Sequence, residues 1–435
     1  MKANPGLAPH RKGEKLALLF PGMGAVATTV MAGALSVRRN LATPVGSLTQ
    51  LGHILDEEGN EGPRLRDALP LARLDDLVFG GWDPIPDDAY AAAVRASVLG
   101  RHHLDPIQAE LQAIRPMPAV FERSWVRRLD GPNVKTGTLR QKAEALTQDM
   151  LGFLERNRCA RGVVVWTGST EVYSEPGPAH RSLQAFEAAL DANDATIAPS
   201  MVYTYAALQA RLPFLNGAPN LATEVPALHE LAVRQGVPTG GKDFKTGQTL
   251  MKTALAPMLR ARMLGLSGWF STNILGNRDG EVLDDAASFK SKEVSKKGVL
   301  DTILLRDRHP ELYGDMEHKV TIHYYPPRGD NKEGWDAIDL FGWLGYPMQI
   351  KINFLCRDSI LAAPLVLDMA LLGDLAARAG ERGPQEWLSF FFKSPITAPG
   401  RSPVHDLFRQ QNMLFERLRR YAESAAAAGV QAAAG

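Results

Sequence analysis

A short apolar run followed by a glycine-rich turn sets the strongest constraint on how this chain folds. The run is KLALLF at residues 15–20, and it is followed by GMGAVA at residues 22–27, which fits the pattern G-x-G-x-x-A. In a strand–turn–helix unit, such glycines permit a tight turn and a close approach of the backbone to a pyrophosphate, and the helix start offers N–H donors. The pattern predicts a dinucleotide site, with a plain strand-to-helix turn as the alternative.

Further apolar runs alternate with helical patterns over the first part of the chain. The runs DDLVFGG (75–81) and RGVVVWTGSTE (161–171) end in small or polar residues, as buried parallel strands do where their carboxyl ends face a ligand. Residues 87–115 and 138–157 have helical periodicity. This alternation predicts a doubly wound α/β domain over roughly the first 240 residues.

The middle of the chain has a different pattern. Residues 319–325 and 348–355 alternate like strands on either side of a turn region rich in Gly, Asp and Lys, which predicts a mixed or antiparallel sheet in a second unit. The apolar run at 358–380 predicts a helix that packs back on the first domain. We therefore expect a Rossmann-type domain in 12–245, a second α+β domain in 246–357, a return to the first domain in 358–422, and a disordered Ala-rich tail in 423–435.

One element of the dinucleotide fingerprint is missing. About 20 residues after the glycines, where an acid would bind the ribose, the chain reads Arg38, Arg39 and Asn40. An acid does follow another predicted strand, at Asp83 in GGWD. It either meets the cofactor in the same crevice or caps a turn, and the sequence favours neither interpretation.

Polar motifs become dense after residue 239. The segment GGKDFKTGQT (240–249) places Gly, Thr and Gln in a loop before a helix, an arrangement that can surround a phosphate with backbone N–H groups and a hydroxyl. The segment STNILGNRDG (271–280) supplies amides and an acid suited to binding sugar hydroxyls.

Four lysines lie in positions that favour an anionic substrate. Lys292 and Lys296 are four apart in SFKSKEVSKKG (288–298), so in a helix their ammonium groups share one face, where like charges repel by about 0.2–0.5 kcal/mol. We interpret the pair as facing an anion. Lys332 in RGDNK and Lys393 in LSFFFKSP are further candidates, and burial would lower the pKa of Lys393 and suit it to proton transfer. Any one of them alone would more often be a solvated surface charge.

Composition and the absence of other motifs exclude several function classes. The formal net charge of +1 gives no general attraction to nucleic acid or acidic membranes, and we expect neither as a partner. The ten histidines form no HExxH or HxH arrangement with a nearby acid, so we expect no metal site. The motifs of serine hydrolases and P-loop nucleotidases are missing too.

Cysteine usage and the N-terminus bear on the cellular compartment. Only Cys159 and Cys356 occur, too few for a disulfide framework. The start MKANPGLAPHRKGEK is polar and does not fit a signal peptide. We expect a cytoplasmic protein.

In their order along the chain, these motifs resemble those of the myo-inositol-1-phosphate synthases, also called inositol-3-phosphate synthases. The matching segments, from about residue 15 to 420, are GMGAVATT, GSLTQLG, VFGGWD, VVVWTGSTE, PFLNGAPN, GKDFKTGQT, LGNRDG, FKSKEVSK, RGDNK, RDSILAAPLVLD and FFFKSP. So many ordered motifs are far more specific than the glycine pattern alone.

The resemblance implies an NAD-dependent isomerisation of D-glucose 6-phosphate to 1D-myo-inositol 3-phosphate, the first step of inositol biosynthesis. In the family's reaction, NAD oxidises C5 of the open-chain sugar, C6 loses a proton and closes on the C1 aldehyde, and the hydride returns to C5. The resemblance also implies a homotetramer assembled through the second domain, which would be the catalytic and tetramerisation domain.

Site residues follow from the resemblance position by position. The catalytic positions are Lys292, Lys296, Lys332, Lys393, Asp243 and Asp358. The NAD-binding positions are Gly22, Gly24, Ala25, Val26, Ala27, Thr28, Asp83, Thr167, Gly168, Ser169 and Thr170. The substrate-binding positions are Thr246, Gly247, Gln248, Asn273, Leu275, Asn277 and Asp279. The match assigns Lys292 to the C5 hydroxyl proton, Lys296 and Lys332 to phosphate and oxyanions, and Lys393 to the C1 carbonyl.

The sequence departs from the family pattern at a few positions. Arg278 stands where many members have Asn, Arg357 where they have Glu, His323 where Lys is common, and Thr246 where Ser is frequent. The two arginines add positive charge beside the expected site, so a cation requirement is not transferred and NAD is the one cofactor expected. A sugar-phosphate dehydrogenase and a catalytically silent NAD- or sugar-phosphate-binding protein are the alternatives.

Overall fold

A six-stranded parallel sheet forms the centre of the first domain. The computed structural model describes residues 7, 9–11, 13–283 and 299–434. Its first sheet has the strand order β12-β7-β6-β5-β1-β4, and every neighbouring pair is parallel. The strands are β1 (Lys15–Pro21), β4 (Leu77–Trp82), β5 (Cys159–Trp166), β6 (Phe214–Asn216), β7 (Pro238–Gly241) and β12 (Gly383–Pro384). Because the chain leaves β1 first for β4 on one side and then for β5 on the other, the strand order reverses between β1 and β5.

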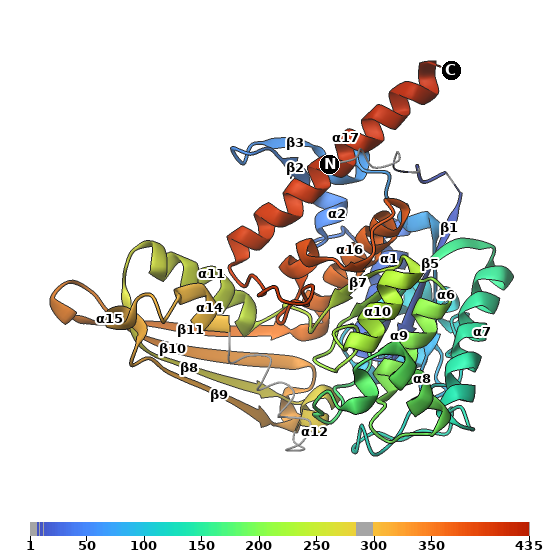
Figure 1. Cartoon of the computed structure of the whole chain (residues 1–435), viewed down its shortest axis with the longest axis horizontal. Helices are drawn as coiled ribbons and strands as arrows, with labels where there is room; N and C mark the ends of the chain where they lie inside the picture. Colours follow the sequence, from blue (N-terminus) through green and yellow to red (C-terminus); the bar gives the residue numbers. More distant parts are fainter. Residues whose placement is uncertain (1–6, 8, 12, 284–298, 435) are drawn as a thin grey trace.

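Helices cover both faces of this sheet, as a doubly wound fold requires (Figure 1). Alternate residues of β1 enter different cores: Leu18 packs in one hydrophobic cluster and Leu19 in the other. The first face is covered by α1 (Ala25–Arg38) and α16 (Asp358–Arg378), and the second by α7 (Leu139–Asn157), α8 (Leu183–Asp191), α9 (Pro199–Gln209) and α10 (Pro226–Gln235). Both α/β character and the strands predicted near 15–20, 75–81 and 161–171 are confirmed.

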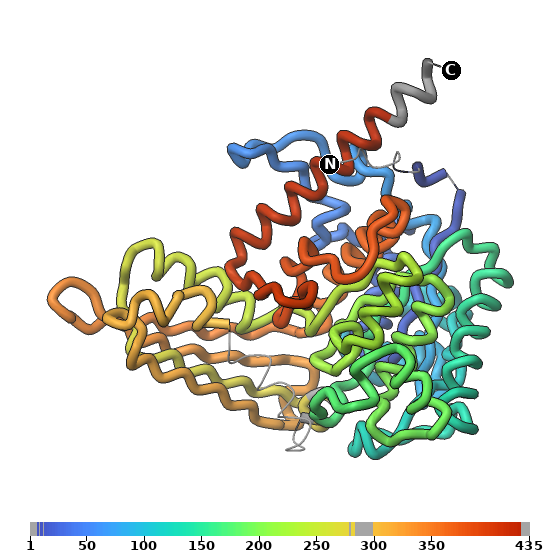
Figure 2. Tube along the Cα trace, in the orientation of Figure 1, coloured from blue at the N-terminus to red at the C-terminus, as the bar shows by residue number. Residues whose placement is uncertain are grey.

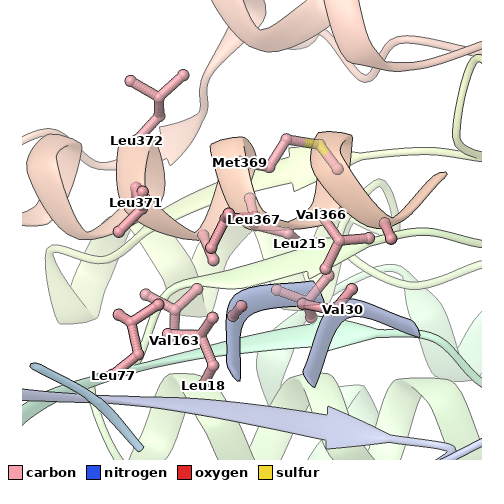
Figure 3. Packing of buried hydrophobic residues seen from close by; sticks show 14 of the residues in the cluster. Leu18, Val30, Leu77, Val163, Leu215, Val366, Leu367, Met369, Leu371 and Leu372 are labelled. Carbon is pink, nitrogen blue, oxygen red and sulfur yellow. The ribbon is translucent and has the colours of Figure 1, made fainter. Parts of the chain in front are cut away.

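The first core joins segments far apart in the chain. Figure 3 shows Leu18, Leu77 and Val163 of the sheet beneath Val30 of α1 and Val366 of α16. Figure 2 shows the orange and red C-terminal part lying beside the blue N-terminal part, in agreement with the contacts of α16 with α1 and α2 (Leu48–Leu51). The chain therefore returns to the first domain after completing the second sheet.

The helix α16 is a core helix of unusual hydrophobicity. It has 21 residues and a mean hydropathy of 1.9, enough by length and composition to cross a membrane, but 72% of that window is buried inside the protein. Its Asp368 is fully buried and accepts hydrogen bonds from the hydroxyls of Ser47 and Thr49 and from the N–H groups of Leu48 and Thr49. Four donors to one carboxylate tie this helix to the N-cap and the first turn of α2.

An insertion separates α1 from β4. It contains α2, a small hairpin and short helical turns: β2 (His53–Leu55), β3 (Glu61–Arg64), α3 (Leu65–Ala68) and η1 (Leu74–Asp76). After β4, the helical pattern predicted over 87–115 is broken into α4 (Ala89–Ala96), α5 (Arg101–Leu104), η2 (Asp105–Ile107) and α6 (Gln108–Gln112). Ser97 caps α4 in a left-handed conformation, and Gly100 precedes α5, so the backbone does not continue as one helix.

The second sheet is mixed, as predicted. Its order is β11-β10-β8-β9, with β8 and β9 parallel and the other pairs antiparallel. The strands are β8 (Gly265–Leu275), β9 (Glu317–Tyr324), β10 (Asn331–Phe341) and β11 (Pro347–Arg357). The helices α11 (Gln248–Ala261), α14 (Val299–Leu304) and α15 (Pro310–Tyr313) contribute to its core. The strands β9 and β11 were predicted, whereas β8 and β10 were not.

The remaining elements are short, apart from the last helix. They are η3 (Pro178–His180), α12 (Arg278–Leu283), η4 (Pro326–Arg328), η5 (Trp343–Gly345), η6 (Glu386–Phe391) and α17 (Leu407–Ala434). Residues 423–434 continue α17, where a disordered tail was expected, and alanine has the highest helix propensity of all residues. The segment predicted to hold Lys292 and Lys296 on one helix face lies outside the described residues.

Candidate functional site

A cavity of about 520 Å³ lies where the two sheets meet. One side consists of residues that follow β1, β4, β5, β6 and β7 at the carboxyl edge of the parallel sheet. The other side consists of residues at one edge of the second sheet and at the start of α16: Gly276, Asn277, Tyr324, Gly329, Asp330, Asp358 and Ser359. The cavity therefore occupies the position at which open α/β sheets bind ligands.

The turn after β1 fits a dinucleotide. Gly22 has φ +89, and a Cβ at this position would lie 2.4 Å from Cα of Gly168, so only glycine is accommodated. Thr167 Oγ1 donates to the carbonyl of Gly22 at 2.7 Å, which joins the loops after β1 and β5 at the point where the strand order reverses. No side chain caps α1 and its first turn has no acid, and Gly24, Ala25 and Val26 at the start of this helix line the cavity.

Asp83 lies at the carboxyl end of β4, the strand next to β1. In a Rossmann fold, the acid that binds the ribose hydroxyl follows this neighbouring strand. Here the insertion between α1 and β4 lengthens the spacing, which explains why residues 38–40 contain no acid. The Asp83 carboxylate lines the cavity and accepts N–H bonds from Met23 at 2.8 Å and Ile85 at 2.9 Å. It therefore shapes the glycine turn as well, so both interpretations of this residue have a structural basis.

Other predicted cofactor residues divide into two groups. Thr167, Gly168, Ser169 and Thr170 line the cavity, as do Gly22 and Gly24. The side chains of Ala27 and Thr28 do not: Ala27 packs in the first core, and Thr28 Oγ1 donates to the carbonyl of Gly24 at 2.9 Å within its own helix.

A buried glutamate, Glu171, follows the loop 167–170 and lines the cavity, and it was not predicted. Glu171 accepts bonds from the N–H and the hydroxyl of Ser200, at 2.9 and 2.5 Å, and its own N–H donates to Asn220. Burial raises the pKa of Glu171 to about 7, against the effect of the Ser200 bonds. The residue belongs to the segment VVVWTGSTE, so the signal was its position in that motif.

Two catalytic candidates, Asp243 and Lys393, are joined by a short antiparallel ladder. Lys393 N donates to the carbonyl of Asp243 at 2.7 Å, and Lys242 and Ser394 exchange bonds at 2.8 and 3.1 Å. The side chains meet as well: Lys393 Nζ lies 3.0 Å from Asp243 Oδ1, and both residues are buried. Since both line the cavity, the pair places a compensated charge in a site of low dielectric.

A second lysine–aspartate pair joins the second sheet to α16. Lys332 Nζ on β10 lies 3.2 Å from Asp358 Oδ2, and Thr246 Oγ1 donates to Asp358 Oδ1 at 2.6 Å. Asp358 and Thr246 line the cavity. The structure thus brings together four of the predicted catalytic residues and one predicted substrate residue.

Asp330, next to this group, was missed although RGDNK was singled out for its lysine. Asn277 Nδ2 donates to Asp330 Oδ1 at 2.9 Å, and both residues line the cavity. Burial raises the pKa of Asp330 to about 6, the bond from Asn277 opposes that rise, and the charge of Asp358 adds to it. Asp330 is therefore an additional candidate for proton exchange near neutral pH.

The other predicted substrate residues are not among those that line the cavity. Gly247 is the N-cap of α11, Gln248 is its first residue, and Asn273 and Leu275 end β8. Asp279 belongs to α12. Lys292 and Lys296 lie outside the described residues.

The described parts of the chain contain no group of three His, Cys, Asp or Glu side chains placed to hold a metal ion. The polar groups around the cavity instead suit an anionic sugar beside a dinucleotide: amides, hydroxyls and lysines paired with carboxylates.

Comparisons with known proteins agree with this arrangement. A family model described as myo-inositol-1-phosphate synthase matches residues 16–419. The chain is 54% identical over 408 residues to inositol-3-phosphate synthase 1 of Bacteroides thetaiotaomicron, covering 93% of this chain and 95% of that protein. It is 32% identical over 400 residues to inositol-3-phosphate synthase of Mesembryanthemum crystallinum, covering 86% and 77%. The crystal structure of inositol-3-phosphate synthase from Caenorhabditis elegans matches with a TM-score of 0.87 and 27% identity, covering 96% and 86%.

The raised pKa of Asp330 predicts a pH-dependent effect of Asp330→Asn on stability. The folded-state pKa of about 6 exceeds the ordinary aspartate pKa of 3.8, so between these pH values the folded protein keeps this proton while the unfolded chain releases it. That contribution is fully present below the unfolded pKa and is lost as pH rises through about 6. An asparagine resembles the protonated acid and does not titrate.

We therefore expect the melting temperature of Asp330→Asn, relative to wild type, to increase between pH 4.5 and pH 7.5, by an amount that corresponds to about 2 kcal/mol. Differential scanning calorimetry at both pH values measures the difference. A constant or decreasing difference would contradict the assignment.

Proposed function

The chain belongs to the myo-inositol-1-phosphate synthase family, and we propose that it converts D-glucose 6-phosphate to 1D-myo-inositol 3-phosphate with NAD, the first step of inositol biosynthesis. The observation that supports this most strongly is that one cavity joins the dinucleotide turn to two lysine–aspartate pairs. A dehydrogenase needs the turn and one proton-transfer group, whereas an isomerase that also closes a ring needs protons handled at several atoms.

NAD fits the residues present. The groups that would hold it are the glycine turn at Gly22 and Gly24, the start of α1, Asp83 and the loop 167–170. Hydride transfer at C5 of the sugar is the chemistry that the nicotinamide supplies when bound. The protein supplies the remaining functions, which are orientation, exclusion of water and proton movement.

The two lysine–aspartate pairs donate hydrogen bonds to the sugar and phosphate oxygens and stabilise the negative charge that develops on them. Lys393 Nζ, held by Asp243, donates a hydrogen bond to the C1 carbonyl oxygen and stabilises the alkoxide that forms there when C6 attacks C1. Lys332, held by Asp358, neutralises the phosphate and developing oxyanions. Asp330, with its pKa of about 6, exchanges a proton near neutral pH.

The lysines at 292 and 296 complete the proposal. Lys292 takes the C5 hydroxyl proton and Lys296 binds phosphate, roles that rest on the family resemblance, since both lie outside the described residues. Thr246, Gly247 and Gln248, which lead into α11, would bind the phosphate through the N–H groups at the start of that helix.

The direct test is incubation of the purified protein with NAD and glucose 6-phosphate, followed by product identification by phosphorus NMR and measurement of absorbance at the NADH band. We expect an inositol phosphate with no net NADH, because the hydride removed from C5 returns to it. Stoichiometric NADH release would instead identify a sugar-phosphate dehydrogenase, and binding without turnover would identify a silent binding protein.

We also propose that the protein assembles as a homotetramer through the second sheet and that it resides in the cytoplasm. The helices α11 and α14 cover one face of this sheet (Figure 1), but Trp335 and Leu355 are exposed on its strands. At the turn between β10 and β11, Trp343 and Leu344 are each 88% exposed. Exposed apolar side chains on an edge strand and at its turn support burial against another copy. Both cysteines are free thiols, which suits a reducing compartment.

Light scattering coupled to size exclusion tests the assembly. We expect a mass four times the chain's 47.4 kDa for the wild type, and a smaller species for Trp343→Ser/Leu344→Ser, because these side chains lose apolar contact area. Val45→Ser, which alters an exposed apolar residue of the first domain, is the matched control and should leave the mass unchanged. A monomeric wild type would refute the proposed assembly.

A further inference from the structure

A buried polar network fastens the start of α11 to the second sheet. At its centre is Asp336 on β10, which is 2% exposed. Its Oδ1 accepts bonds from Trp269 Nε1 at 2.8 Å and from Ser271 Oγ at 2.5 Å, and its Oδ2 accepts one from Gln248 Nε2 at 3.1 Å. Asp336 does not line the cavity, and none of the roles proposed above involves it.

The chemistry of its neighbours fixes the orientation of the Gln248 amide. The terminal atom that contacts Asp336 also lies 3.1 Å from the carbonyl oxygens of Thr272 and Trp335. Carbonyl oxygens only accept hydrogen bonds, so this atom is the NH₂ group and not the oxygen. The Gln248 oxygen therefore points the other way, toward Asn273.

The same reasoning fixes Asn273. Gln248 Oε1 only accepts, so the Asn273 atom bonded to it is Nδ2. This leaves Asn273 Oδ1, which is buried and has no hydrogen-bond partner among the described residues. An orphaned buried acceptor costs about 1–3 kcal/mol, so this oxygen is suited to a donor from a ligand.

We propose that Asp336 is a positioning residue that orients the Gln248 and Asn273 amides, so that Asn273 presents a carbonyl oxygen and recognises a hydroxyl donor of the sugar rather than its phosphate. The inference rests on the proposed function, which supplies a sugar phosphate as the ligand. The location agrees with it, because Asn273 lies near the end of β8 and Asn277, four residues on, lines the cavity.

The Gln248 side chain packs against Gly334 of β10, where a larger residue would displace it. A Cβ added at Gly334 on β10 would lie 3.1 Å from Gln248 Cγ and 3.3 Å from its Nε2. Glycine therefore leaves room for the amide to lie flat against the strands. Gly334→Ala displaces Gln248 without changing Asp336, and so provides a second, independent perturbation.

The test compares Asp336→Asn with Asp339→Asn, an exposed aspartate on the same strand that accepts a bond from Gln349. Calorimetry on the NAD-loaded protein measures the Kd of glucose 6-phosphate and of its 2-, 3- and 4-deoxy analogues, and fluorescence measures the Kd of NAD. Asp336→Asn places an NH₂ group among the three donors that bond to this side chain. The orientation of the Gln248 amide, and through it that of the Asn273 amide, is then no longer fixed.

For Asp336→Asn we expect glucose 6-phosphate to bind about tenfold more weakly, with NAD affinity unchanged. In wild type, one deoxy analogue should have a higher Kd than glucose 6-phosphate, and in Asp336→Asn the ratio of these two Kd values should fall to about one. Gly334→Ala should have the same effect in smaller measure, and it replaces the first variant if Asp336→Asn does not fold. Asp339→Asn should resemble wild type.

A purely structural role would lower the melting temperature and leave the discrimination among analogues unchanged, and this result would overturn the inference. Equal binding of all analogues by the wild type would overturn it too. Absence of glucose 6-phosphate binding by the wild type would refute the proposed substrate and, with it, this inference.

Discussion

The short ladder between residues 242–245 and 391–394 is the interaction on which the site depends. The first strand of this ladder follows β7, and the second comes about 150 residues later, after the whole second domain and α16. The ladder therefore closes the loop in the chain, and it places Asp243 and Lys393 side by side at the carboxyl edge of the parallel sheet. On its other side, Lys245 donates to Gln410 of α17 and lies over the ring of Phe390, and burial lowers the pKa of Lys245 to about 7.

The interruption of the first domain by the second brings residues of both domains to one cavity. The carboxyl ends of β1, β4 and β5 line the half of the cavity that we assign to the dinucleotide, as expected for a doubly wound fold. The second sheet provides Lys332 and Asp330, and the start of α16 provides Asp358. Since α16 is buried and tied through Asp368 to the N-cap and first turn of α2, the position of Asp358 is set by the core of the first domain. Charges from both domains are thus fixed relative to the cofactor turn.

The sequence predicted the fold class and several of the residues that line the cavity, and there are physical reasons why it missed others. The strands β8 and β10 were not predicted because apolar and polar residues exchange their usual places on them. Trp335 is exposed, whereas Asp336 and Asn273 are buried in a hydrogen-bonded network. Periodicity assumes apolar residues on the buried face, so it fails where the core is polar. Asp83 was proposed as a cofactor residue, but the sequence did not explain why it lies so far along the chain from the glycines. The reason is the insertion between α1 and β4, which spacing alone does not reveal. Asp330 was missed because its raised pKa arises from burial between distant segments.

We propose that Lys393, held by Asp243, stabilises the alkoxide that forms on the reacting sugar oxygen. The most direct measurement is the rate of inositol phosphate formation by Lys393→Met, with the double variant Lys393→Met/Asp243→Asn to remove the unpaired buried charge if the single variant is unstable. The account predicts a fall in kcat of about 100-fold or more, with NAD still bound. A kcat close to that of wild type in a folded, NAD-binding variant would contradict it.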